Sequence, residues 1–308
     1  MTHFSLIQEI ECHENIIFYI LPLSDGRLAS CSCDYTIKIH SISPKYCNDI
    51  TILGHKGSVT SITEIKQTVI ASSSFDDTIK IWNISKSKYK LLHTLTGHIS
   101  IVTKVIYVPH KNVLISCSQD KTIRVWDLSL KQIQTTHILN EHIHYIENLY
   151  LLPSNNNILI SGAITHSTLF FWAINSNYKC IHSIKKVPCC SNDSILEISE
   201  GRIIVGGLDR ISVIDCKSYE IITVVYIQGL KKVFSFEKYT NKNNDIIICG
   251  CFDRIAMISF TIGQCEYIMG DNSIHEGGIQ IIKKVKDDVY VSGSIDGYMK
   301  IWNVKIDL

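Results

Sequence analysis

The sequence lacks a dominant charge. Its 30 lysines and arginines nearly balance 29 aspartates and glutamates, so the formal net charge is +1. A protein that binds nucleic acid through bulk charge would carry a clear basic excess, and we therefore do not expect direct nucleic-acid binding. The sequence also has no apolar run near the roughly 18 residues of a membrane-spanning helix. No basic region precedes an apolar stretch at its start, so we expect neither a secretory signal peptide nor a membrane partner.

The common motifs of catalytic and cofactor sites are missing as well. We find no G-x-G-x-x-G, no G-x-x-x-x-G-K-[ST], no H-E-x-x-H and no G-x-S-x-G. The cysteines and histidines give no complete tetrahedral zinc set. These absences lead us to expect no enzyme, no metal and no cofactor. The 12 cysteines suit small buried side chains in a reducing compartment, which favours the cytoplasm, or alternatively the nucleus.

The sequence does contain a repeat. Its fullest copy runs from Ser72 to Trp82, and related segments occupy residues 30–40, 116–126, 161–172, 205–215, 249–259 and 292–302. The anchor positions are spaced by 42 to 46 residues, and they are Asp34, Asp76, Asp120, His166, Asp209, Asp253 and Asp296. A period of this length is typical of radially repeated sheets.

Each repeat has the pattern of four short strands. In the second repeat, residues 59–62 and 78–82 alternate apolar and polar side chains, residues 69–73 form a more buried run, and residues 91–95 supply a fourth strand. Asp76-Asp77 predicts a tight turn between two of them. One such sheet cannot bury both of its faces alone, so neighbouring sheets must stack on it. The sequence therefore predicts an all-β fold: one seven-bladed β-propeller of four-stranded antiparallel blades over residues 1–308.

The residues that recur resemble a known family. Gly54-His55, Ser72, Asp76 and Trp82-Asn83 resemble the WD-repeat family of β-propellers. The resemblance implies a hydrogen-bonded His–Ser–Asp–Trp tetrad in each intact blade. The implied tetrads are His55–Ser72–Asp76–Trp82, His98–Ser116–Asp120–Trp126 and His275–Ser292–Asp296–Trp302. It also implies a non-catalytic scaffold that docks peptides or protein domains on the faces of the ring.

Ser, His and Asp together also occur in hydrolases. A catalytic triad needs an exposed nucleophile, a base within reach and an oxyanion hole. Here the same residues recur at a structural spacing, each time with a tryptophan, which favours a structural network over catalysis.

The ends of the chain predict how the ring closes. The last strand pattern, residues 298–304, is followed by only four residues, so the seventh blade lacks an outer strand. Residues 3–11 form a spare strand pattern, with Ile10 three residues before His13. We expect this N-terminal strand to pair with the last blade and complete the ring.

The repeats are unequal. His40 replaces the tryptophan in the first, His166 replaces the aspartate in the fourth, and the fifth and sixth have Asp215 and Ser259 in place of tryptophan. Drift would explain the loss, because apolar strands can still stack. Reshaping of blades 4–6 around a partner would also explain it, but drift is favoured because irregular repeats are common in such arrays.

By resemblance, the residue before each anchor points toward one face of the ring. These candidate partner-binding residues are Cys33, Phe75, Gln119, Thr165, Leu208, Phe252 and Ile295. Most are apolar, which suits either a hydrophobic anchor of a partner or packing between loops. Cys31 and Cys33 are expected in one strand.

Two other functions stay open. The chain could be the substrate-recognition subunit of a ubiquitin ligase, which would then require adaptor proteins. It could also be a ribosome-associated scaffold, and the lysines at Lys86, Lys88, Lys90, Lys185 and Lys186 could bind an anion, although such runs are commonly solvated loops. In each case we expect a single ring within a larger complex.

Overall fold

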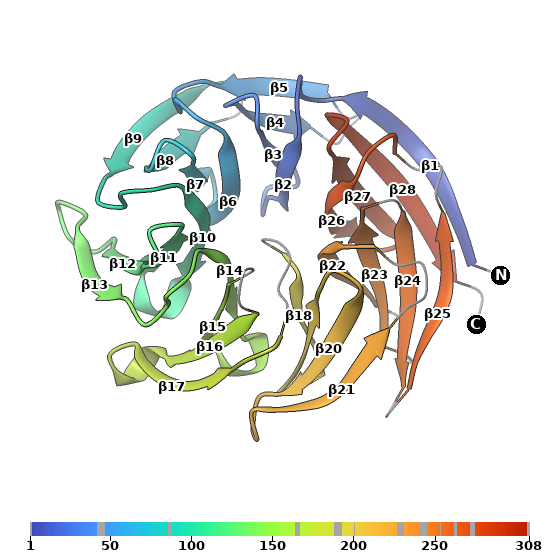
Figure 1. The fold of residues 1–308 in the computed structure, drawn as a ribbon. Coiled ribbons are helices and arrows are strands. Elements are labelled where there is room, and N and C mark those ends of the chain that lie inside the picture. The colour runs from blue at the N-terminus through green and yellow to red at the C-terminus, as the bar shows by residue number, and fades with distance from the viewer. Residues whose placement is uncertain are drawn as a thin grey trace.

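The protein is a ring of seven small sheets. The computed structural model describes residues 2–41, 47–85, 88–163, 167–187, 193–199, 201–226, 231–240, 245–252, 254–261, 264–271 and 275–306. Seven four-stranded antiparallel sheets surround a central axis (Figure 1). The predicted seven-bladed β-propeller is confirmed. The predicted residues Lys86, Thr165, His166 and Asp253 lie outside the described residues.

The first three blades follow the chain in order. Blade 1 has β2 (Ile17–Pro22), β3 (Leu28–Ser32), β4 (Ile37–Ser41) and β5 (Cys47–Ile52). Blade 2 has β6 (Val59–Lys66), β7 (Val69–Ser74), β8 (Ile79–Ile84) and β9 (Tyr89–Leu95). Blade 3 has β10 (Val102–Val108), β11 (Val113–Ser118), β12 (Ile123–Asp127) and β13 (Thr135–Leu139).

The remaining blades repeat this plan. Blade 4 has β14 (Ile146–Leu151), β15 (Ile158–Ala163), β16 (Thr168–Ala173) and β17 (Lys179–Ile184). Blade 5 has β18 (Ile195–Ser199), β19 (Arg202–Gly206), β20 (Arg210–Asp215) and β21 (Glu220–Tyr226). Blade 6 has β22 (Val233–Thr240), β23 (Asp245–Cys251), β24 (Ile255–Thr261) and β25 (Gln264–Asp271). Blade 7 has β26 (Ile279–Lys286), β27 (Val289–Ser294), β28 (Tyr298–Ile306) and β1 (Thr2–Glu11). Three single-turn 3-10 helices, Pro109–Lys111, Pro153–Asn155 and Ile174–Ser176, lie in connections.

The order of strands defines two faces. Each blade begins at the axis and ends at the outer rim (Figure 1). Because neighbouring strands are antiparallel, the loops between second and third strands lie on the same face as the loops that enter each blade. We call this the upper face. The loops between first and second strands, and between third and fourth, form the lower face.

Apolar contacts join the blades around the ring. Six clusters of buried side chains each span neighbouring blades: blades 7, 1 and 2, then 2 and 3, 3 and 4, 4 and 5, 5 and 6, and 6 and 7. Both faces of every sheet are therefore buried against a neighbour, as a half-apolar sheet requires. Ile, Val and Trp side chains dominate these contacts, because β-branched and aromatic residues fit a pleated surface.

The two ends of the chain close the ring. β1 pairs antiparallel with β28, from Thr2 opposite Ile306 to Glu11 opposite Tyr298, with one register shift between Leu6 and Gln8. The predicted closure by the N-terminal strand is confirmed, and Figure 1 shows both termini beside blade 7.

Two serine–glutamate contacts link blades on the lower face. The Ser24 backbone N–H donates to Glu64 Oε2 at 2.9 Å, and its hydroxyl donates to Glu64 Oε1 at 2.8 Å. Ser154 makes the same pair of contacts with Glu197, three blades further on, with 2.9 Å from its N–H to Oε2. The repeat pattern does not reveal this link, because the glutamate belongs to the next blade.

One sequence expectation about strands is wrong. Cys31 lies fully buried in β3, but the strand ends at Ser32, and Cys33 lies half-buried in the upper-face loop. Its N–H donates to the Ile16 carbonyl at 2.9 Å, outside the β3–β4 ladder.

Candidate functional site

Blade 2 contains a continuous set of side-chain hydrogen bonds. His55 Nδ1 lies 2.8 Å from Asp76 Oδ2, and His55 Nε2 lies 2.8 Å from Ser72 Oγ. The Trp82 indole N–H donates to the same Ser72 oxygen at 2.9 Å. These distances assign the hydrogens: His55 donates to the carboxylate, and the Ser72 hydroxyl donates to the imidazole while accepting from the indole. Every polar atom of the set that faces the interior therefore has a partner.

The local backbone explains why Gly54 precedes the histidine. Gly54 has a φ of +147°, and a Cβ there would lie 2.9 Å from the Trp82 ring. A larger residue would push the indole away from Ser72, so this position needs glycine.

Blades 3 and 7 have the same geometry. In blade 3, His98 lies 2.7 Å from Asp120 and 2.8 Å from Ser116, and Trp126 donates to Ser116 at 2.9 Å. In blade 7, His275 lies 2.8 Å from both Asp296 and Ser292, and Trp302 donates to Ser292 at 2.8 Å.

The tetrad aspartates have altered acidity. Burial alone would raise the pKa of Asp76, but hydrogen bonds from His55 and Thr78 outweigh it and hold that pKa well below its usual range. The pKa of Asp120 is lowered in the same way by His98 and Thr122. The serine at the centre is fully buried and engaged on two sides, so its oxygen cannot reach a substrate. The geometry of these tetrads is that of a structural network.

In blade 1 a histidine occupies the place of the tryptophan. His40 Nε2 lies 2.8 Å from Ser30 Oγ, and His13 Nε2 lies 2.8 Å from the same oxygen. Since His13 Nδ1 donates to Asp34 at 2.8 Å, Ser30 donates to His13 and accepts from His40. His40 thus replaces the indole N–H. The sequence showed the loss of tryptophan but not this replacement.

Blade 4 keeps only part of the network. His142 Nε2 lies 2.6 Å from Ser161 Oγ, and Trp172 donates to Ser161 at 2.8 Å. Burial lowers the pKa of His142 to about 4, and the nearby charge of His144 adds to the shift.

In blades 5 and 6, apolar contacts take the place of the tetrad hydrogen bonds. Asp209 is exposed on the upper face, and Asp215, at the tryptophan position, accepts hydrogen bonds from the N–H groups of Lys217 and Ser218 in a turn. The buried Phe236 ring of blade 6 lies against Gly206 of blade 5, where an added Cβ would come within 3.1 Å of it.

Charged side chains meet at the centre of the ring. Asp193, just before β18, lies 2.5 Å from Lys283 Nζ of β26 and 3.5 Å from Lys104 Nζ of β10. Glu237 of β22 lies 3.8 Å from Lys283. We call Lys104, Asp193, Glu237 and Lys283 the channel cluster, because they come from innermost strands or their entry (Figure 1).

The channel cluster is largely removed from water. Burial alone would lower the pKa of Lys283, but the carboxylates of Asp193 and Glu237 outweigh it and raise that pKa well above its usual value. Burial raises the pKa of Glu237, which Lys283 only partly offsets. The Tyr19 ring lies 6.0 Å from Lys104 Nζ and 5.6 Å from Lys283 Nζ, within reach of a cation–π interaction. Blades 1, 3, 5, 6 and 7 are thereby joined across the axis.

The candidate partner-binding residues lie on the upper face. Leu208 is 64% exposed, Phe252 49%, Phe75 44% and Ile295 36%. Cys33 and Gln119 are half-buried, and the Gln119 amide donates to Glu147 at 3.4 Å. The Phe75 ring stacks on Phe18 of β2, with centroids 6.2 Å apart. Four of these residues therefore present apolar surface on the upper face.

Exposed apolar side chains are distributed unevenly between the faces. Of the 21 large exposed hydrophobic residues among those described, nine lie in upper-face loops and one, Leu130, lies in a lower-face loop; the other 11 lie on outer strands. The nine are Tyr35, Leu53, Phe75, Ile99, Ile143, Tyr145, Leu208, Phe252 and Ile295. The sequence pattern found only the four that precede an anchor position. Ile99 and Ile143 share a different register, directly after His98 and His142, which that pattern did not include.

A family profile matches the first three blades. The profile described as "WD domain, G-beta repeat" matches residues 4–41, 47–83 and 89–127. The same four-stranded unit continues through the seven sheets of the ring. The first three blades are therefore WD repeats, and the whole ring is a seven-bladed β-propeller.

Relatives match short parts of this ring. The nuclear distribution protein nudF of Aspergillus niger is 42% identical over 60 residues, which are 19% of this chain and 14% of the relative. The nuclear distribution protein PAC1 of Fusarium vanettenii is 35% identical over 86 residues, 25% of this chain and 19% of the relative. The WD repeat-containing protein pop2 of Schizosaccharomyces pombe is 36% identical over 88 residues, 29% of this chain and 12% of the relative. The chain thus matches less than one fifth of the length of each of these relatives.

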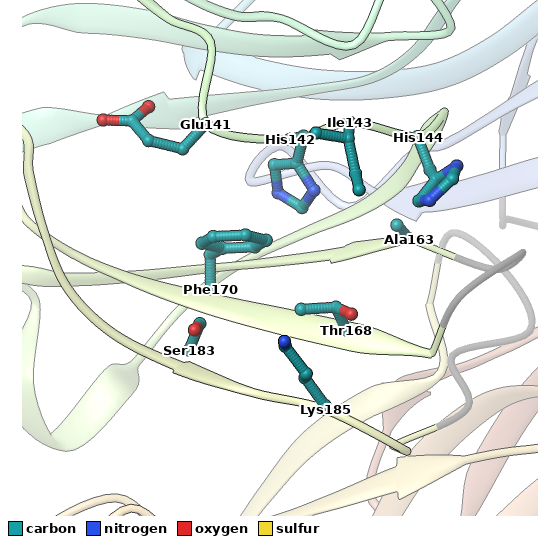
Figure 2. A pocket seen from close by; sticks show the side chains of 9 residues that line it. All are labelled: Glu141, His142, Ile143, His144, Ala163, Thr168, Phe170, Ser183 and Lys185. Carbon is teal, nitrogen blue, oxygen red and sulfur yellow. The ribbon is translucent and has the colours of Figure 1, made fainter.

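The altered blade 4 has a pocket of about 280 Å³ on the upper face. His142 and Phe170 form one wall, with ring centroids 4.3 Å apart, and Lys185 points toward them from beyond β17 (Figure 2). Blade 3 has Arg124 and blade 2 has Lys80 at the register of Phe170, two residues before the tryptophan. A shorter, apolar side chain at that register leaves the space open.

The described ranges contain neither a metal-binding cluster nor a membrane-spanning helix. No three His, Cys, Asp or Glu side chains there are placed to hold a metal ion. No helix in that same part of the ring has the length and apolar character to cross a membrane.

Proposed function

We propose that this protein is a non-catalytic interaction scaffold that docks protein partners on the upper face of its ring. The observation that carries the proposal is the unequal distribution of exposed apolar side chains, nine on the upper face against one on the lower. Contiguous exposed apolar surface favours association with another protein. Loops on a rigid scaffold commonly supply such sites.

The upper face also suits a protein better than a nucleic acid. Its exposed charged residues include both signs, for example Glu14 and Glu276 beside Lys56 and Lys121. A phosphate backbone would favour a basic surface. Apolar anchors surrounded by mixed polar groups are instead the usual anatomy of a protein interface. The mixed charges and apolar anchors of the upper face favour a protein-docking scaffold over the ribosome-associated alternative.

The cysteines support a reducing location. The eight cysteines whose side chains the structure describes are free thiols, and five of them are buried. Free thiols are typical of the cytoplasm and nucleus. We therefore propose a cytoplasmic scaffold, with the nucleus as the other reducing compartment, and a partner that is itself a protein or peptide.

The test compares the two faces directly. Tagged protein, the double variant Phe75→Ala/Phe252→Ala and the lower-face control Leu130→Ala are used to capture partners from cell extract, followed by quantitative mass spectrometry. Because large apolar residues near the centre of an interface dominate its binding energy, the double variant should lose specific partners by about tenfold or more. The control should retain them.

Thermal unfolding must first show that all three proteins fold alike. The proposal is wrong if the double variant folds normally and keeps the partners of the wild type. It is equally wrong if Leu130→Ala loses them.

A further inference from the structure

The outer strand of each blade is a sheet edge. Such an edge carries unpaired N–H and C=O groups and can pair with another strand unless charge, twist or cover prevents it. Among the outer strands with described side chains, β13 and β17 each expose one large apolar residue, β1 exposes two, β9 exposes three and β21 exposes four. β21 is therefore the most apolar described edge of the ring.

The apolar residues of β21 form a stripe. Ile222, Val224 and Tyr226 are 48%, 37% and 65% exposed, and they alternate with the half-buried Thr223 and Val225. Alternate residues of a strand share one face of its sheet. Val224 and Tyr226 therefore lie on one side of blade 5, directly at its free edge. Ile222 lies next to them at a register shift of the β20–β21 ladder, between Ile221 opposite Ile214 and Thr223 opposite Val213.

Opposite charges lie at the two ends of this stripe. At one end Arg210 pairs with Tyr226 in the β20–β21 ladder, and its guanidinium donates to the Tyr226 hydroxyl at 3.4 Å. At the other end Asp215 pairs with Glu220. The edge is basic at one end and acidic at the other.

We propose that β21 pairs with β21 of a second copy of this chain, antiparallel about Thr223, so that two blades form one continuous eight-stranded sheet. Ile222 then lies opposite Val224 of the second copy, and Val224 lies opposite its Ile222. The two apolar stripes merge into one patch, and each strand satisfies the free edge of the other. Cross-strand pairs of β-branched residues are favourable in such a sheet.

The charges select the second copy and its direction. In the antiparallel arrangement Glu220 lies opposite Tyr226 of the second copy, next to the Arg210 that pairs with that tyrosine. The basic end of each edge therefore meets the acidic end of the other. A parallel arrangement would place Glu220 against Glu220, and like charges directly opposite each other are unfavourable.

The outer strand β9 is an edge that cannot pair in this way. It exposes Leu91 and Leu92, but an antiparallel pair about Leu92 would place Lys90 opposite Thr94 of the second copy. Thr94 is paired with Lys80, whose ammonium donates to it at 3.1 Å. Lys90 of one copy and Lys80 of the other would then lie close together. β9 is therefore a matched negative control for β21.

The test measures self-association by analytical ultracentrifugation. Interfaces smaller than about 1,200 Å² are commonly weak, so the protein is examined up to about 200 μM. We expect a reversible monomer–dimer equilibrium for the wild type. A lysine within the apolar patch, Ile222→Lys, should raise the dimer dissociation constant by about tenfold or more. Leu92→Lys in β9 should leave it unchanged.

A charge exchange tests the pairing itself. Arg210→Glu and Glu220→Arg should each weaken the dimer, whereas the double variant should restore it, because the opposite ends again carry opposite charges. Equal melting temperatures confirm that each variant folds. A wild type that remains monomeric at all concentrations overturns the proposal. So does a dimer that Ile222→Lys leaves intact, or one that the double exchange fails to restore.

Discussion

Blades 2 and 3 and blades 5 and 6 build the same four-stranded sheet with different contacts. In blades 2 and 3 a buried serine joins a histidine and a tryptophan, and an aspartate fixes the histidine from the upper face. In blades 5 and 6 the aspartate of the pattern is exposed at Asp209, and aromatic and aliphatic side chains fill the interior. The tetrad is therefore not required to form a blade in this ring. It stabilises the upper loops of the blades that have it.

Blades with a tetrad and blades without one also differ in the charged side chains that they place at the axis. The lysines of the channel cluster come from blades 3 and 7, which have complete tetrads. Its carboxylates, Asp193 and Glu237, come from blades 5 and 6, which have none. The altered blades thus contribute the anions that neutralise cations from the intact ones.

The largest effect should follow from removing the central carboxylate. Asp193→Asn leaves the ammonium groups of Lys104 and Lys283 buried without their shared partner. Breaking a buried ion pair on one side commonly costs about 3–5 kcal/mol, so we expect a loss of this size in the free energy of unfolding. Urea denaturation measures it.

Asp287→Asn is the matched control for this prediction. Asp287 contacts Lys284 at 3.2 Å but is fully exposed, and exposed ion pairs contribute little. A loss for Asp193→Asn as small as that of the control would show that the channel cluster does not hold the ring together.

The second prediction compares the histidines of intact and altered blades. Burial lowers the pKa of His98, but Asp120 partly offsets the effect; for His142 burial and the charge of His144 act together and bring the pKa to about 4. A histidine with a lowered folded-state pKa stabilises the fold fully above its unfolded pKa, near 6.5, and loses that contribution as the pH falls toward 4. We expect His142 to account for about 2–3 kcal/mol of lost stability in this window.

His142→Gln should remove most of this pH dependence. The remainder should come from His13 and His98, whose pKa values burial also lowers. Urea denaturation at several pH values between 7 and 4 is the measurement, and the exposed His110→Gln serves as control. An unchanged slope for His142→Gln would contradict the assignment. The tetrad carboxylates, whose folded-state pKa values are lowered, lose most of their contribution to stability below pH 4, because that loss starts near their unfolded pKa of about 3.9.

The sequence repeat allowed the ring of blades to be predicted, but not the channel cluster at its axis. The period and the Ser, Asp and Trp positions gave seven blades, four strands each, and closure by residues 3–11, because each of these is a local pattern copied along the chain. The channel cluster has no such pattern: Asp193 is 89 residues from Lys104 and 90 from Lys283. Glu237 and Lys283 share a register of their innermost strands, but Lys104 lies at another register and Asp193 precedes its strand, so aligning the repeats could not bring the four together.

The same limit applies to the replacement in blade 1 and to the edge of blade 5. In the sequence, His40 marks only the loss of a tryptophan. Its hydrogen bond to Ser30 shows that a ring nitrogen of His40 replaces the indole N–H. On β21 the alternation of Ile222, Val224 and Tyr226 is visible in the sequence, but buried strands show similar runs. Its position at a free edge, with Arg210 and Glu220 at opposite ends, had to come from the pairing of the strands.

The smallest expected effects compare one aspartate of the repeat in two settings. Asp76 accepts hydrogen bonds from His55, from the Lys56 N–H at 2.9 Å and from the Thr78 hydroxyl at 2.6 Å. Asp76→Asn replaces one acceptor oxygen by an NH₂ group among these donors, which should cost about 1–3 kcal/mol. Asp209→Asn in blade 5 changes an exposed side chain and should stay within about 0.5 kcal/mol of the wild type. Urea denaturation of both variants measures the loss in the free energy of unfolding. Equal losses would mean that Asp209 takes part in a hydrogen-bond network of its own. Blades 5 and 6 would then contain altered tetrads and not apolar contacts in their place.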